Sequence, residues 1–150
     1  MIDAAGHPKT LEFNCRMGDP ETQPIMMRLK SDLLEVLLAA TAGELDRVEL
    51  QWDRRTALGV VLAAEGYPLS PRKGDAITGL PKDADDLMVF HAGTVEEGGA
   101  VRTAGGRVLC VTALADSVRQ AQQRAYDAIR GIHFDGMQFR HDIGHRAVKS

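Results

Sequence analysis

A short run near the amino terminus carries the side chains best suited to chemistry. Glu12, Asn14 and Arg16 alternate with less polar residues, and the run then breaks at Gly18-Asp19-Pro20. Because alternate side chains of a strand point to the same face, we expect these three polar groups to lie side by side. A carboxylate and an amide oxygen are hard donors that Mg²⁺ or Mn²⁺ accepts, and arginine neutralises phosphate oxygens. The pattern therefore indicates a phosphoryl-transfer site, although a half-exposed strand without a ligand alternates in the same way.

Hydrophobic periodicity predicts the elements that hold this run. A turn at Gly6-His7-Pro8 favours a β-hairpin whose second strand carries the polar face. From residue 24 to residue 42, apolar residues recur at spacings of three and four, which predicts a helix ended by Gly43. Arg28 and Lys30 within this helix are either anion binders beside the loop or members of a solvated face.

The remainder of the chain is predicted to be rich in strands. Residues 48–52 are expected to form a brief strand that ends in a packing residue, Trp52. Residues 57–64 form a continuous apolar run typical of a buried strand, which we place at the middle of the second unit. The capping-box spacing at Ser117 predicts a helix that runs to Gly131 and covers the strands. Three segments separated by glycine pairs are expected to form an antiparallel meander, at residues 88–96, 101–103 and 107–114.

Several single side chains in this half are candidates for binding or catalysis. The loop of residues 65–75 is rich in glycine and proline and ends in Arg72 and Lys73, which either bind an anion or are exposed surface cations. Arg107 follows two glycines and is a further candidate anion ligand. His91 is either a catalytic base, since histidine titrates near neutrality, or a structural residue of its strand.

Composition excludes several classes of protein. With 150 residues, 44% of them hydrophobic, the chain can bury a core, and its formal net charge of -3 offers no basic stripe for nucleic acid. No apolar run approaches the roughly 20 residues that cross a bilayer, and the amino terminus lacks the pattern of a signal peptide. Cys15 and Cys110 lie too far apart in sequence for a zinc or redox motif, so we expect two reduced core thiols. The composition favours a soluble cytoplasmic protein.

A resemblance to a known enzyme family extends over nearly the whole chain. The stretch from Leu11 to Gln23 is similar to the signature of the phosphoribosylamine–glycine ligases, also called glycinamide ribonucleotide synthetases, which are ATP-grasp enzymes of purine biosynthesis. Later motifs resemble the carboxyl-terminal third of that family in the same order: residues 58–64, Gly66-Tyr67-Pro68, Arg72-Lys73-Gly74-Asp75, Phe90-His91-Ala92-Gly93-Thr94, Gly105-Gly106-Arg107-Val108-Leu109 and Arg140-His141-Asp142-Ile143-Gly144.

The resemblance implies an ATP-dependent carbon–nitrogen ligase. The intact enzyme of this family uses ATP to phosphorylate the carboxylate of glycine, and the amine of 5-phosphoribosylamine then attacks the glycyl phosphate. Carried onto this chain, the resemblance implies that Glu12 and Asn14 hold Mg²⁺ or Mn²⁺ at the nucleotide phosphates. Arg16 would lie beside the transferring phosphoryl group, and Asp19 would orient the substrate amine or cap the next helix. The phosphate of 5-phosphoribosylamine would be bound by two cations of the later loop, Arg72 and Lys73.

We therefore expect a mixed α+β architecture with two parts. Residues 1–45 would be the end of an ATP-grasp domain, a β-hairpin plus a helix. Residues 46–150 would form a small antiparallel, barrel-sandwich-like domain of about five strands with a covering helix. Met1 is expected to be an internal methionine, so the implied partners are the upstream ATP-grasp lobes and the small-molecule substrates, with no nucleic acid and no membrane. The piece alone is expected to be inactive, because it contains no glycine-rich lid for ATP.

Two other functions stay open from the sequence. One is a different ATP-grasp ligase that joins another carboxylate to an amine. The other is a β-rich module without catalytic activity that acts in binding or assembly. The polar face of Glu12, Asn14 and Arg16 favours the ligases, since a pure binding module does not need a strand that carries metal ligands.

Overall fold

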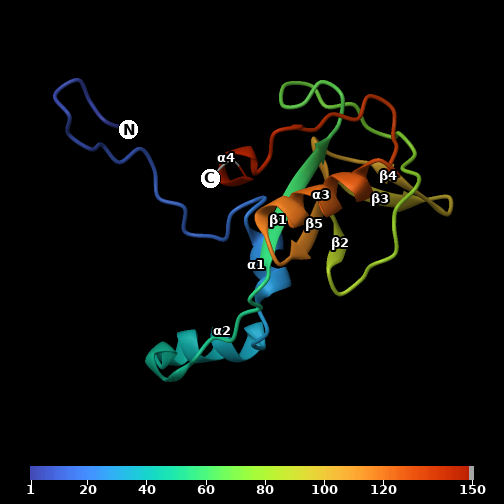
Figure 1. The fold of residues 1–150 in the computed structure, drawn as a ribbon. Coiled ribbons are helices and arrows are strands. Elements are labelled where there is room, and N and C mark those ends of the chain that lie inside the picture. Colours follow the sequence, from blue (N-terminus) through green and yellow to red (C-terminus); the bar gives the residue numbers. More distant parts are fainter. Residues whose placement is uncertain (149–150) are drawn as a thin grey trace.

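The computed structural model describes residues 1–148 and shows a mixed α+β architecture with antiparallel sheets (Figure 1). The predicted fold class is confirmed in these respects, and the covering helix is present. The helices are α1 (Thr22–Arg28), α2 (Leu33–Ala42), the 3₁₀ turn η1 (Leu45–Arg47), α3 (Val118–Ile129) and α4 (His145–Val148). The strands are β1 (Thr56–Ala63), β2 (Leu87–His91), β3 (Thr94–Glu97), β4 (Ala100–Thr103) and β5 (Arg107–Ala115).

The main sheet is built around β5. Its strand order is β1-β5-β2, and both pairings are antiparallel. Every residue of β5 after Arg107 is buried, which suits a strand with neighbours on both sides and cover on both faces. The buried strand predicted at residues 57–64 is confirmed as β1, but our placement of it at the middle was wrong, since β1 lies at an edge.

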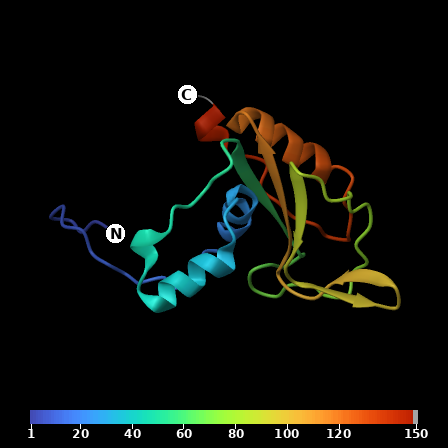
Figure 2. The same ribbon diagram turned by 90° about the horizontal axis from the view of Figure 1, so that it is seen from below.

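Helices cover the two faces of this sheet (Figure 2). Val60 of β1 and Val111 of β5 are paired and share the buried core with Ala121 and Ala125 of α3. The next residue of β1, Gly59, points to the other face, where a Cβ would lie 3.3 Å from Cγ of Pro24. The absence of a side chain at Gly59 therefore lets α1 pack closely against the sheet.

The strands β3 and β4 form a separate two-stranded sheet. The turn at Gly98-Gly99 is confirmed, but the predicted meander is wrong because β5 pairs with β1 and β2 rather than with β4. The predicted strand of residues 88–96 is also interrupted, at Ala92 and Gly93. A Cβ on Gly93 would lie 2.6 Å from Cα of Gly105, so the backbones cross there and separate β2 from β3. The two sheets do not close into a barrel within residues 1–148.

The amino-terminal segment departs most from the prediction. The strand expected along residues 10–16 does not form, and the hairpin is reduced to a turn with an isolated bridge between Ile2 and Pro8. A strand needs a neighbour to pair its backbone N–H and C=O groups, and the described residues place none beside this segment. Figure 1 shows it running away from the sheet as an extended blue trace.

The single helix predicted for residues 24–42 is wrong, because the chain forms α1 and α2 with an extended break between them. Leu29 in the break makes an isolated bridge to Trp52, and the Asp32 side chain accepts a hydrogen bond from the Leu34 backbone to cap α2. That bridge is all that forms of the strand predicted at residues 48–52. Gly43 ends α2 in a left-handed conformation with φ of 73°, as predicted.

The buried core lies entirely after residue 52. Among the described residues, none before Asp53 is buried, and the apolar side chains of the first 50 residues stay at least partly exposed. Cys15 is exposed and so does not have the core position that we predicted, and Trp52, predicted as a packing residue, is 41% exposed. Cys110 is a buried free thiol as expected, and burial raises its pKa.

Candidate functional site

The motif run lines an open cavity of about 370 Å³ although it is not a strand. The amide Nδ2 of Asn14 donates to Oε1 of Glu12 at 3.4 Å, so the two side chains lie on the same side of the extended chain. We name this hollow the motif cavity, and its lining residues are Glu12, Asn14, Arg16, Gly18, Asp19 and Glu21. The side-by-side arrangement expected from the sequence is therefore present, without the strand pairing that was expected to produce it.

The loop at the end of the motif is tied to two elements of the fold. On the α1 side, the Thr22 hydroxyl donates to the Gly18 carbonyl, and Nε2 of Gln23 lies 3.5 Å from Oδ1 of Asp19. On the β5 side, Nη1 of Arg107 donates to the Asp19 carbonyl at 3.0 Å, and its Nε lies 3.4 Å from the Asp19 carboxylate. Arg107 was a candidate anion ligand, and the anion beside it in the structure is the Asp19 carboxylate of the same chain.

The donors of the motif cavity fit a hard divalent cation. Glu12 offers a carboxylate, and Asn14 has an amide oxygen that is free to turn outward, since its nitrogen is the atom that faces Glu12. Within residues 1–148, no group of three or more His, Cys, Asp and Glu side chains gathers as a metal site. A cation at Glu12 and Asn14 would therefore take its other ligands from phosphate oxygens and water, which is how Mg²⁺ is commonly held.

The two loop cations predicted to bind phosphate differ in their surroundings. The guanidinium of Arg72 is shared among three carboxylates, with Nε 2.9 Å from Asp75 and further pairs to Glu65 and Asp135. Lys73 is exposed, and the described part of the chain gives it no ion pair. No hydrogen bond or ion pair among residues 1–148 joins either cation to a residue of the motif cavity.

His91 is placed as a structural residue. It is exposed at the end of β2, and its Nδ1 lies 3.1 Å from the hydroxyl of Thr94, the first residue of β3. The contact bridges the break between the two strands. It gives the ring no acidic partner of the kind that orients a catalytic base.

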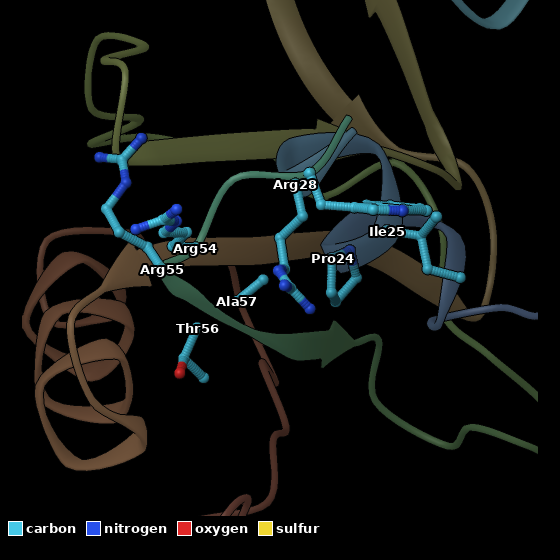
Figure 3. Close-up of a pocket in the computed structure, with 8 residues that line it drawn as sticks. Pro24, Ile25, Arg28, Arg54, Arg55, Thr56 and Ala57 are labelled. Atoms are coloured by element: carbon cyan, nitrogen blue, oxygen red, sulfur yellow. The ribbon is translucent and has the colours of Figure 1, made fainter. Parts of the chain in front are cut away.

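A second cavity, of about 500 Å³, lies between α1 and the start of β1 (Figure 3). Two of its three arginines already have partners in the chain, because Nη2 of Arg28 donates to the Asp53 carbonyl at 3.0 Å and two side-chain nitrogens of Arg55 donate to the Asp53 carboxylate. Asp53 is buried, and no sequence pattern pointed to its role. The cavity is lined by Pro24, Ile25, Arg28, Trp52, Arg54, Arg55, Thr56 and Ala57. These contacts fix α1 to β1, so we assign this region a structural role.

Asp53→Asn is expected to make the stability of the chain less sensitive to acid. Hydrogen bonds from Arg55 hold the pKa of Asp53 far below its usual range. A lowered pKa in the folded state gives stability that is present above about pH 4, the unfolded value, and is lost as the pH falls below it. Urea unfolding at about pH 5.5 and about pH 2.5 measures how much the free energy of unfolding falls between the two pH values. This fall should be smaller in the variant than in the parent chain.

The control for this prediction is Asp116→Asn. Asp116 is exposed and makes no ion pair within the described residues, so its replacement should leave the acid response of the parent unchanged. An Asp53→Asn variant that loses stability in acid as steeply as the parent would contradict the prediction.

The fold and the motif cavity define the class of the chain as a mixed α+β domain that follows a carboxylate–amide motif loop. A family model described as "Phosphoribosylglycinamide synthetase, C domain" matches residues 57–146, which contain both sheets and α3. The chain belongs to this family. Within residues 1–148, no helix has the length and apolar composition of a membrane-spanning segment.

Relatives extend the match to the motif itself. The chain is 65% identical over 149 residues to the phosphoribosylamine–glycine ligase of Ralstonia nicotianae, and 58% identical to that of Vibrio vulnificus. Each match covers 99% of this chain but only 35% of the relative, so the chain spans about a third of their length. A crystal structure of phosphoribosylamine–glycine ligase from Thermotoga maritima shares the fold with a TM-score of 0.77 and 37% identity, over 92% of this chain and 34% of that one.

Proposed function

We propose that this chain is the carboxyl-terminal part of an ATP-dependent ligase that joins glycine to 5-phosphoribosylamine. The reaction proceeds through glycyl phosphate and gives glycinamide ribonucleotide, ADP and phosphate in purine biosynthesis. The observation that carries the proposal is the 65% identity to a phosphoribosylamine–glycine ligase over 149 residues, motif cavity included. The proposal places the protein in the cytoplasm, where purine precursors are made.

The residues of the motif cavity would offset the negative charge of the phosphates during phosphoryl transfer. Glu12 and Asn14 would hold Mg²⁺ or Mn²⁺, which supplies positive charge at the nucleotide phosphates when bound. Arg16 would add a guanidinium beside the transferring phosphoryl group, where it offsets the negative charge of the equatorial oxygens. Asp19 would accept a hydrogen bond from the substrate amine and so orient it toward the acyl phosphate.

The phosphate of 5-phosphoribosylamine would be bound by Arg72 and Lys73. Lys73 is the freer of the two, whereas Arg72 would have to exchange one of its carboxylate partners for the phosphate. We therefore expect Arg72 to position the loop as well as bind. Both residues follow Gly66-Tyr67-Pro68 in the loop after β1, in which the Gly74 N–H donates to the carbonyl of Thr103 in β4.

An upstream region would complete the site. We propose that residues 1–45 are the carboxyl-terminal end of an ATP-grasp domain and that residues 46–150 form the separate carboxyl-terminal domain. The absence of buried residues before Asp53, in the described part of the chain, supports this division. So do the exposed apolar side chains of α2, which include Leu34, Leu37 and Leu38. Such a surface suits contact with another part of the same protein.

The test joins this chain to the part of the Ralstonia nicotianae relative that lies upstream of the match. We call this protein the joined ligase. It is expected to form glycinamide ribonucleotide from glycine, 5-phosphoribosylamine and ATP, with release of ADP, whereas this chain alone is expected to form none. Chromatographic measurement of ADP and the amide product checks both statements. A joined ligase that folds but accepts only other carboxylates or amines would overturn the proposal.

A further inference from the structure

We propose that Arg107 is a positioning residue for the motif cavity. From the first position of β5, it holds Asp19 in place beside Glu12 and Asn14. The proposal rests on the proposed function and adds a residue to it that lies outside the motif. In this view the carboxyl-terminal domain is itself a support for the motif loop.

One guanidinium holds Asp19 at two points. Nη1 of Arg107 donates to the Asp19 carbonyl at 3.0 Å, and Nε lies 3.4 Å from Oδ2 of the same residue. Two nitrogens of a rigid planar group fix both the backbone and the side chain of their partner, which a single ammonium cannot do. The contact therefore sets where the loop lies and also which way the Asp19 carboxylate points.

Arg107 is well placed to act as an anchor. It opens the central strand of the main sheet, and every later residue of that strand is buried. The turn before it is tightly packed, because a Cβ on Gly106 would lie 2.3 Å from the ring of Tyr67. The motif run, in contrast, has no strand partner among the described residues and depends on contacts at its end.

The contact is suited to placement rather than to stability. The side chains of Arg107 and Asp19 are 42% and 44% exposed, and ion pairs with that much exposure contribute little to the free energy of unfolding. A small displacement of a group that orients a substrate, however, costs a large factor in rate. Loss of Arg107 should therefore slow the reaction while the domain stays folded.

The first test uses this chain alone and hydrogen exchange of residues 17–24. Arg107→Gln is expected to speed exchange of these amides by about three- to tenfold, because the loop opens more often without its anchor. The matched control is Arg124→Gln. Arg124 is 43% exposed, pairs with Asp86, and donates to the Leu114 carbonyl at 3.0 Å, so it makes the same kinds of contact away from the motif. Equal exchange of the motif loop in the parent and Arg107→Gln would overturn the proposal.

The second test measures turnover of the joined ligase. Arg107→Gln is expected to lower kcat about ten- to a hundredfold, with KM for ATP changed less than about twofold. Arg107→Lys should recover part of the loss, and Arg124→Gln should leave kcat unchanged. Asp19→Asn combined with Arg107→Gln should lower kcat by less than the product of the two single losses, since both substitutions remove the ion pair between the Asp19 carboxylate and the Arg107 guanidinium.

The outcomes separate this proposal from its alternatives. Independent, multiplicative losses in the double variant, or a rise in KM for 5-phosphoribosylamine alone, would make Arg107 a direct ligand of the substrate phosphate and overturn its positioning role. If the unmodified joined ligase forms no product, the proposed function fails. The hydrogen-exchange result in this chain then still decides whether Arg107 orders the motif loop.

Discussion

Glu12→Gln in the joined ligase is expected to lower kcat by about a hundred- to a thousandfold. The substitution keeps the shape of the side chain but removes the charge that would hold the divalent cation. A bound metal ion contributes several kcal/mol of charge stabilisation in the transition state, and each 1.36 kcal/mol is about a tenfold change in rate. The measurement is ADP release as a function of Mn²⁺ concentration. The concentration that gives half-maximal rate should rise as kcat falls.

The control for this variant is Glu44→Gln. Glu44 precedes η1, and its carboxylate pairs with Arg47 at 2.6 Å on the surface. The Glu44→Gln variant therefore loses the same charge outside the motif cavity. It should keep both the rate and the Mn²⁺ requirement of the parent. Full activity of Glu12→Gln at an unchanged Mn²⁺ requirement would show that Glu12 does not hold the divalent cation.

Phe134→Ala is expected to lower the free energy of unfolding of this chain by about 3–5 kcal/mol. Phe134 is 1% exposed and belongs to the core formed by β1, β5 and α3. Removing its ring loses buried apolar contact and leaves a cavity that packed neighbours cannot fill. A loss of this size is a large part of the 5–15 kcal/mol that typically separates folded from unfolded domains. Urea unfolding followed by far-ultraviolet circular dichroism measures it.

Phe13→Ala is the matched control, because it makes the same chemical change on the surface. Phe13 is 85% exposed in the motif run. Its replacement should change the free energy of unfolding by less than about 0.5 kcal/mol. Equal losses in the two variants would show that the motif run is packed as tightly as the core, contrary to the structure.

Elements with a strong local pattern were predictable from the sequence. The apolar run that forms β1 and the Ser117 cap of α3 follow from side chains close together in the chain, and both are confirmed. Predictions failed where a distant contact overrides local preference. The helix from residue 24 stops because Leu29 pairs with Trp52, and the strand from residue 88 breaks because Gly93 meets another backbone.

The sequence by itself determined which donors the motif carries and how they are spaced. Residues two positions apart in an extended chain lie on the same side, so Glu12 and Asn14 are neighbours even though the segment pairs with no other strand among residues 1–148. Only the tertiary structure decided which distant residues hold the motif loop in place. Asp19 and Arg107 are 88 positions apart, and they meet because α1 and β5 pack together. Of the three carboxylates around Arg72, Glu65 and Asp75 belong to the same loop, whereas Asp135 comes from the segment after α3 and lies near Arg72 only in the folded chain. Such contacts depend on how elements fold onto one another, which local periodicity does not encode.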